Sequence, residues 1–219
     1  MTNLIAWSFS RLESFETCPK KHWHISVRKD VVDPPNEHTI YGDETHKSFA
    51  KFLTKGTPLP ISIRHYTPLL SKFRNAPGEH IVEQQVAINA NYAQTGWFDK
   101  DVYLRVISDL TIMVPPRAIM IDWKTGKPKK DFTQLRVAAA TMFMIAPELE
   151  TISMSFVWLK NKTVDTDTMT RDEMPDVWAA LHPRLVAYQA AFDNEAFPAR
   201  QGFHCRYCPV KACPYNEKK

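Results

Sequence analysis

The feature that most constrains this chain is a pair of strand-like segments, residues 102–114 and 117–124, separated by only two prolines. So short a connection requires the two strands to lie side by side and antiparallel. Successive side chains of a strand point to opposite faces, so Asp122 and Lys124 share one face near the end of the second segment. Asp109 of the first segment can approach Asp122 across the pair. The sequence therefore predicts a hairpin that gathers two carboxylates and an amine.

The periodicity of the remaining chain places this hairpin inside a mixed fold. Apolar residues recur at helical spacing in some segments and at alternate positions in others. The resulting order predicts an α/β (α+β) architecture, a central mixed β-sheet flanked by helices. Pro19 should kink or end the first helix. The predicted helices span residues 10–24, 39–53, 64–75, 132–146 and 174–194, and the strands span 81–92, 102–114, 117–124, 152–159 and 162–169.

The composition bounds the class of protein. With 219 residues, 44% of them hydrophobic, the chain is predicted to form a single domain with a substantial core. No apolar run is long enough to span a bilayer, and the first residues lack the features of a signal peptide, so we expect a cytoplasmic protein without membrane contact. The formal charge of +4 permits nucleic-acid binding without requiring it.

The end of the hairpin carries the residue types of a metal-dependent phosphodiesterase. Asp109 and Asp122 can hold Mg²⁺ or Mn²⁺, and Lys124 can position a water and stabilise the transition state. Glu83, near the preceding strand, is predicted to be an outer ligand or to orient the others. The simpler alternative is a surface ion pair between Asp122 and Lys124. However, residues 118–121 are apolar on both faces, which is typical of a central strand.

The four cysteines form a second candidate site. Cys205, Cys208 and Cys213 crowd the C-terminal segment, and Cys18 lies in the first predicted helix. Clustered cysteines of a reducing compartment are more often metal ligands than disulfides. Four thiolates suit either tetrahedral Zn²⁺ or a [4Fe–4S] cluster, and the spacing leaves both open. We expect such a group to staple the Cys-rich segment to the N-terminal helix, with a structural role.

The hairpin motif resembles that of a known family. Asp109, followed by the run Asp122-Trp123-Lys124-Thr125-Gly126, is similar to the active-site hairpin of the PD-(D/E)XK nuclease superfamily, and most of all to its RecB-like branch. The resemblance implies a restriction-endonuclease-like core and two-metal-type hydrolysis of phosphodiester bonds. It further implies that Asp109 and Asp122 hold the metal, that the Trp123 carbonyl is a further ligand, and that Lys124 positions the water.

Two more motifs resemble those of the same superfamily. Gly42 and His46 resemble the family's Gly-x-x-x-His, in which the histidine ligates a metal, so the resemblance implies His46 as a ligand. Gln134 resembles the start of the family's Gln-x-x-x-Tyr motif, which contacts DNA and supports the catalytic site. The tyrosine position is Ala138 here, and Val106 stands where many relatives carry glycine. These departures concern DNA contacts and not the metal ligands.

The N-terminal segment adds a further resemblance. Residues 8–12, Phe15 and Cys18-Pro19 are similar to the N-terminal motif of iron–sulfur nucleases of the Cas4-like group. In that group one early and three late cysteines hold a [4Fe–4S] cluster, which implies the same role for the four cysteines here, with Zn²⁺ as the alternative. The implied organisation is one nuclease domain over residues 1–219, with a cluster module at 1–30 and 197–219 and the catalytic sheet and helix at 80–146.

The implied function is a Cas4-like exonuclease that uses Mg²⁺ or Mn²⁺ to hydrolyse single-stranded DNA ends in a prokaryotic or phage-infected cell. A nuclease-fold DNA-binding or adaptor protein, serving recombination, replication or CRISPR spacer acquisition, is the alternative. The combination of Asp109, Asp122 and Lys124 favours the enzyme, because a pure binder has no need of all three.

Overall fold

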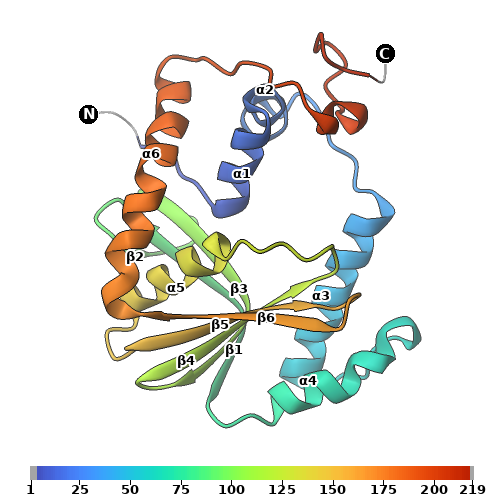
Figure 1. The fold of residues 1–219 in the computed structure, drawn as a ribbon, viewed down its shortest axis with the longest axis vertical. Helices are drawn as coiled ribbons and strands as arrows, with labels where there is room; N and C mark the ends of the chain where they lie inside the picture. The colour runs from blue at the N-terminus through green and yellow to red at the C-terminus, as the bar shows by residue number, and fades with distance from the viewer. Residues whose placement is uncertain (1–3, 218–219) are drawn as a thin grey trace. The chain divides into compact units, whose positions relative to one another are not determined.

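The computed structural model describes residues 4–217. The chain forms two compact units, which we describe separately (Figure 1). The sheet unit comprises residues 35–177, and the cysteine unit comprises residues 1–34 and 178–219. The sheet unit carries the acidic residues of the hairpin, whereas the cysteine unit carries all four cysteines.

One mixed sheet organises the sheet unit. Its six strands lie in the order β2-β1-β3-β4-β5-β6, and every neighbouring pair is antiparallel except β4 and β5, which run parallel. The predicted mixed sheet flanked by helices is therefore confirmed. The strands are β1 (Glu79–Asn89), β2 (Gln94–Thr95), β3 (Val102–Val114), β4 (Arg117–Lys124), β5 (Thr151–Trp158) and β6 (Thr163–Thr170).

Strands β3 and β4 form the expected hairpin. Leu110 lies opposite Ile121, so Asp109 and Asp122 come next along the two strands. The parallel strand β5 lies on the other side of β4, with Phe156 opposite Asp122. β4 is thus a central strand, as its apolar residues predicted, and its polar end lies between β3 and β5.

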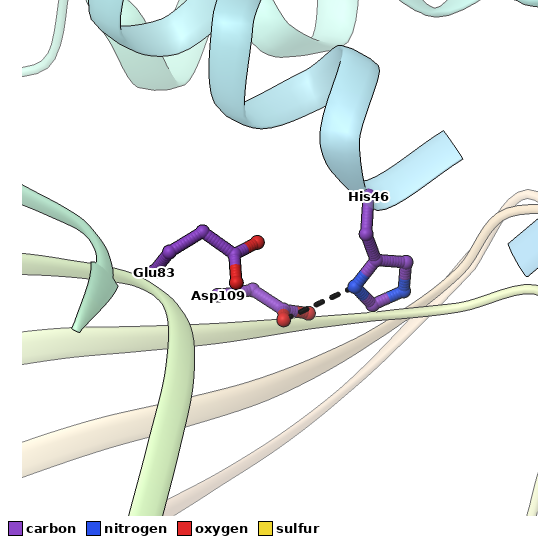
Figure 2. A group of neighbouring side chains, drawn as sticks. All are labelled: His46, Glu83 and Asp109. Atoms are coloured by element: carbon purple, nitrogen blue, oxygen red, sulfur yellow. Dashed lines mark hydrogen bonds and ion pairs between the residues drawn. The ribbon is translucent and has the colours of Figure 1, made fainter. Parts of the chain in front are cut away.

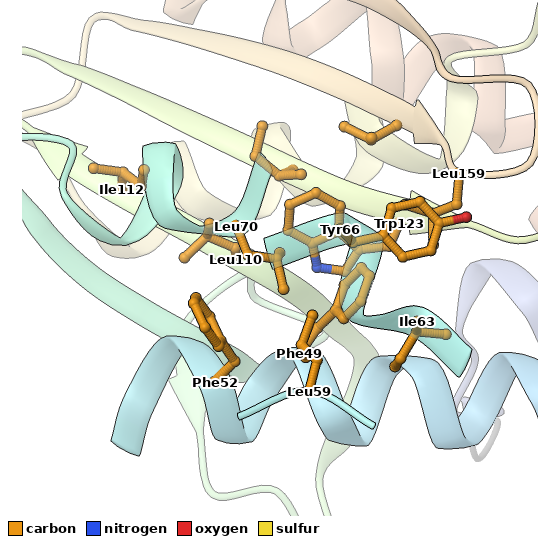
Figure 3. Close-up of a cluster of buried hydrophobic side chains, with 12 residues drawn as sticks. Phe49, Phe52, Leu59, Ile63, Tyr66, Leu70, Leu110, Ile112, Trp123 and Leu159 are labelled. Atoms are coloured by element: carbon orange, nitrogen blue, oxygen red, sulfur yellow. The ribbon is translucent and has the colours of Figure 1, made fainter. Parts of the chain in front are cut away.

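A hydrophobic cluster fixes one face of this sheet (Figure 3). Trp123 of β4 is only 1% exposed, and its ring meets those of Phe49 on α3 (Glu37–Lys55) and Phe73 on α4 (Thr67–Arg74) edge-on, at 5.5 and 5.3 Å. Side chains alternate along a strand, so burying Trp123 turns its neighbours Asp122 and Lys124 to the opposite face. The same core that stabilises β4 therefore also aims its polar residues.

Helix α5 (Thr133–Ile145) connects β4 to β5 and packs against β3, β4 and β5. Asp131 Oδ1 accepts a hydrogen bond of 2.9 Å from the Thr133 backbone N–H just before the first turn. Arg136 of this helix reaches Asp167 of β6, with 2.7 Å between Nε and Oδ2. The first contact caps the start of α5 and the second ties the helix to β6, whereas Gln134 of the same helix reaches Lys124 and Asp122 at the end of β4.

The cysteine unit is built from helices. The segment predicted as one helix over 10–24 is divided: α1 (Phe9–Thr17) ends before Cys18, Pro19 opens α2 (Pro19–His22), and a π-helical turn, η1 (Trp23–Arg28), follows. Proline is favoured at a first helical position and cannot continue the preceding helix, which explains the break.

The remaining parts of this unit are most of α6 (Met174–Asp193) and a tail containing the short turn η4 (Phe203–Tyr207). Aromatic side chains form much of its core. Phe15 packs edge-on against Tyr188 and Phe197, with ring centroids 5.1 and 6.5 Å away. Within residues 4–217, no helix combines the length and apolar character needed to cross a membrane.

Candidate active site

Three side chains from three elements of the sheet unit converge on one point. Figure 2 shows His46 of α3, Glu83 of β1 and Asp109 of β3 turned toward one another. One ligand atom from each lies within 4.8 Å of the others, and His46 Nδ1 is hydrogen-bonded to Asp109 Oδ1 at 3.1 Å. An imidazole nitrogen and two carboxylate oxygens form a donor set that suits Mn²⁺ or Mg²⁺.

The backbone at Glu83 departs from ordinary strand geometry. Its φ of 52° lies in the left-handed region, which is unfavourable for a residue with a Cβ. The β1–β3 ladder pairs the residues on either side of Glu83 but not Glu83 itself. Backbone strain of this kind persists only where the surrounding structure enforces it, and it concentrates at functional sites.

Asp109 is held in place by the hairpin itself. Its Oδ2 accepts a hydrogen bond of 2.8 Å from the Trp123 backbone N–H, while its Oδ1 faces His46. The residue is only 9% exposed, so both carboxylate oxygens have defined positions. The sheet therefore pre-organises this side chain before any ion is bound.

A second group lies at the end of β4. Lys124 Nζ lies 2.8 Å from Asp122 Oδ2 and donates a hydrogen bond of 3.1 Å to Gln134 Oε1. The Gln134 amide in turn donates from Nε2 to Asp122 Oδ1, at 3.2 Å. An ammonium has three N–H donors, so this triangle orients Lys124 and leaves donor capacity for a water or a phosphate oxygen.

The pKa shifts of Asp122, Glu83 and His46 indicate an excess of negative charge at this site. Burial raises the pKa of Asp122 to about 6, against the attraction of Lys124 and with a further contribution from the charge of Asp109. Burial also raises the pKa of Glu83, again with Asp109 adding to the effect. For His46 burial opposes protonation, but the hydrogen bond and charge of Asp109, with the charges of Asp122 and Glu83, outweigh it and raise its pKa.

Burial raises the pKa of the two carboxyls, and the crowding of carboxylates adds to that shift and also raises the pKa of His46. A divalent cation bound among them would relieve that repulsion. The residues present therefore fit the metal that this type of hairpin implies, on donor chemistry and on charge. The structure brings His46, Glu83 and Asp109 together and sets Asp122 within their electrostatic reach.

A cleft of about 660 Å³ opens beside this candidate metal site. One wall is a stripe of α3, which the sequence reasoning did not identify as functional apart from His46. Helical spacing was the available signal, because positions 39, 43, 46, 47, 50 and 51 share one face. Gly42 also lines the cleft, and a Cβ there would lie 3.3 Å from Thr125 Oγ1, so the loop after β4 approaches the helix closely. The lining residues are His38, Thr39, Gly42, Asp43, His46, Lys47, Ala50, Lys51, Glu83 and Thr125.

The four cysteines line a different pocket, in the cysteine unit. All four are buried free thiols, between 5% and 6% exposed. Lys20, Lys21 and Arg200 line the same pocket, and the Arg200 backbone N–H donates to Cys18 Sγ at 3.5 Å. Burial raises the pKa of the Cys208 thiol, with the neighbouring Cys18 and Cys213 adding to it. Thiols gathered in this way, with cations beside them, fit a group that binds thiolates.

The chain is similar to a known protein family and to a solved structure. The family model for the PD-(D/E)XK nuclease superfamily matches residues 63–214, which include Glu83, Asp109, Asp122, Lys124 and Gln134. No curated protein matches the chain. Among solved structures, the crystal structure of SSO0001 is similar at 17% identity, with a TM-score of 0.49 over 99% of this chain and 88% of that one. Because the family match covers more than half of its length, the chain belongs to the PD-(D/E)XK nuclease superfamily.

Proposed function

We propose that this protein is a Cas4-like deoxyribonuclease that uses Mg²⁺ or Mn²⁺ to remove nucleotides from single-stranded DNA ends in the cytoplasm of a prokaryotic or phage-infected cell. Membership of the superfamily supports metal-dependent nuclease activity. The observation that carries the proposal is the convergence of His46, Glu83 and Asp109, beside the Asp122, Lys124 and Gln134 triangle. The substrate and mode of cleavage rest on the resemblance of the motifs.

The residues divide between holding the ion and handling the water. His46, Glu83 and Asp109 would hold the metal, with Asp122 and the Trp123 carbonyl as further ligands. A divalent cation there supplies charge neutralisation for the phosphate during cleavage. Lys124, held by Asp122 and Gln134, orients the attacking water and donates to a phosphate oxygen.

The cysteine pocket belongs to the same proposal. Cys18, Cys205, Cys208 and Cys213 would hold a [4Fe–4S] cluster, whose thiolates Lys20, Lys21 and Arg200 would neutralise. The group would act as a staple between Cys18 and the tail and would take no part in hydrolysis. Anaerobically purified protein should be brown and contain iron and sulfide. A colourless protein that contains one zinc ion would show that the cysteines bind Zn²⁺ and not a cluster, and the nuclease proposal would remain unchanged.

The nuclease proposal is tested with end-labelled single-stranded and duplex DNA, in the presence of Mg²⁺, of Mn²⁺ and without divalent ions. The single strand should be shortened from its end only when a metal is present. Asp109→Asn should abolish cleavage, because it removes charge from the shared ligand position, whereas the exposed Asp176→Asn should cleave normally. Cleavage by Asp109→Asn at the native rate would exclude this site as the catalytic centre.

The same experiment separates the enzyme from a DNA-binding adaptor. An adaptor would retard both DNAs on a gel and leave them intact with either metal. That result would reject the exonuclease while retaining the superfamily fold.

A further inference from the structure

The tail of the cysteine unit presents two aromatic rings on its surface. Phe203 is 71% exposed and Tyr207 is 65% exposed, at the two ends of the short turn η4. Their ring centroids are 6.1 Å apart, and the Arg206 guanidinium lies 4.9 Å from the centre of the Phe203 ring. Large apolar rings are costly to leave in water, and a cation stacked on one of them is typical of a recognition surface.

Buried cysteines hold the turn that carries the rings of Phe203 and Tyr207. Cys205 lies between them in sequence and Cys208 follows Tyr207, and both cysteines are 5% exposed. Asn216 donates hydrogen bonds of 3.0 and 2.9 Å to the carbonyls of Cys208 and Val210, which fixes the tail that follows. The turn therefore places its cysteines inside and its rings outside, and the group bound by the cysteines would hold the rings at a fixed spacing.

The charge of the chain is concentrated in the same unit. The cysteine unit contains eleven lysine and arginine residues against seven acidic ones, whereas the sheet unit contains seventeen of each. The entire formal net charge of +4 thus belongs to the unit that carries the rings. Arg206 pairs with Glu217 at 3.4 Å, but both side chains are more than half exposed, so a phosphate can displace this weak contact.

We propose that Phe203, Arg206 and Tyr207 form a stacking platform for the bases of single-stranded DNA. Exposed rings beside cations are the arrangement that binds unpaired bases and their phosphates without regard to sequence. A duplex keeps its base faces stacked inside and offers nothing to these rings. The inference rests on the proposed function, since it assigns this surface to the same substrate.

Another exposed ring supplies a matched control. Phe98 of the sheet unit is 90% exposed, but the loop around it holds Asp99 and Asp101, which repel phosphate. The loop also holds the exposed Lys100, but the two aspartates outnumber it, and Arg105 is already engaged with Trp97, to whose carbonyl it donates at 2.9 Å. Phe98 therefore has the exposure of the platform without an excess of positive charge.

The test is fluorescence anisotropy of the full-length protein, purified with the metal group of its cysteines in place, with a labelled oligothymidylate and with a duplex. The buffer contains no divalent ions, so that binding is measured without cleavage. Phe203→Ala combined with Tyr207→Ala should weaken binding of the single strand about five-fold or more, the loss expected for even one stacked base. Duplex binding should change little. Phe203→Trp with Tyr207→Trp should retain the native affinity, and so should Phe98→Ala.

Arg206→Gln gives an independent measurement. Loss of one phosphate contact should lower the slope of log Kd against log salt by about 0.7 for a single strand. An unchanged slope, native affinity in a folded double alanine variant, or an equal loss in Phe98→Ala would each overturn the platform. Binding to anionic lipid vesicles with no binding to oligothymidylate would also overturn it.

The two proposals fail in different ways. A protein that binds single strands through these rings but never shortens them refutes the nuclease and leaves the platform. A protein that cleaves single strands, and whose ring variants bind normally, refutes the platform and leaves the nuclease.

Discussion

The two candidate sites of this molecule are built on opposite principles. The acidic site draws its side chains from α3, β1, β3, β4 and α5, and each is fixed by hydrogen bonds or by the strand on which it stands. The cysteine site depends on a tail with little packing of its own. Among the residues that the structure describes, its buried hydrophobic cluster consists of Cys208, Val210 and Cys213, with Val31 and Ala199 packed against it.

The difference predicts what a bound metal would contribute at each site. The acidic site is pre-organised by a large core, so a cation bound there should contribute little to folding and would serve the proposed chemistry. The cysteine site gathers four thiols from distant parts of the sequence, so the bound group should supply much of its stability. Substitutions in the acidic site should therefore lower activity more than stability, and substitutions of the cysteines should lower stability more than activity.

The largest expected effect on chemistry is that of Lys124→Met. It removes the ammonium while keeping a similar chain length, and cleavage of end-labelled single-stranded DNA should fall about 10³-fold, as for the loss of one transition-state donor. The melting temperature should stay within a few degrees of the native value. Lys160→Met, an exposed lysine in the β5–β6 turn, is the control and should cleave normally. A Lys124→Met protein that retains full activity would remove this residue from the mechanism.

The largest expected effect on stability is that of Cys205→Ala. Loss of one thiolate should release the bound metal group and destabilise the tail by about 3 kcal/mol or more. Trypsin should then cut after Arg200 and Arg206 much faster, while the sheet unit stays resistant. Metal content and the pattern of fragments by mass spectrometry check this, with Phe203→Ala as a control that retains the metal. Equal resistance in Cys205→Ala would show that the tail is held by packing alone.

Much of this contrast was predictable from the sequence. Alternating residues and the paired prolines predicted the β3–β4 hairpin, and the structure confirms it with Leu110 opposite Ile121. The apolar face of α3, with Phe49, and the burial of Trp123 on the face opposite Asp122 follow from the same periodicities. Patterns of this length are reliable because many residues repeat the same signal.

The rest depends on tertiary structure. Nothing in the strand pattern around Glu83 marks a left-handed residue, because glycine is the usual signal and none stands there. The turn η1 after α2 is likewise enforced by packing, with the ring of Trp23 stacked on Phe197 from the far end of the chain at 4.3 Å. Contacts between residues so distant in sequence have no local signature.

An intermediate effect of pH on stability is expected from His22 of the cysteine unit. His22 is fully buried with its Nε2 3.2 Å from the Tyr188 hydroxyl, and burial, with the charge of Arg11, lowers its pKa from 6.5 to about 4. Between pH 6.5 and 4, His22 binds a proton in the unfolded chain but stays neutral in the folded unit. The contribution of His22 to stability should therefore be constant above pH 6.5 and fall by at most about 3 kcal/mol as the pH drops from 6.5 to 4.

Urea unfolding at several pH values measures this loss. His22→Phe keeps a ring against Phe15 and Tyr188 but cannot titrate, so its stability should lose this pH dependence. If His22→Phe and the native protein show the same loss between pH 6.5 and 4, another group is responsible.

The smallest expected effect concerns the strained residue of the acidic site. Glu83→Ala and Glu83→Gly both remove the carboxylate and its repulsion with Asp109, but only glycine adopts a φ of 52° without a steric penalty. The glycine variant should be more stable than the alanine variant by about 1 kcal/mol, which corresponds to about 2–4 °C in melting temperature for a chain of this size. Both should bind Mn²⁺ more weakly than the native protein. If Glu83→Ala proves as stable as Glu83→Gly, residue 83 does not carry backbone strain in solution. The surrounding sheet would then not be forcing Glu83 into its position beside Asp109.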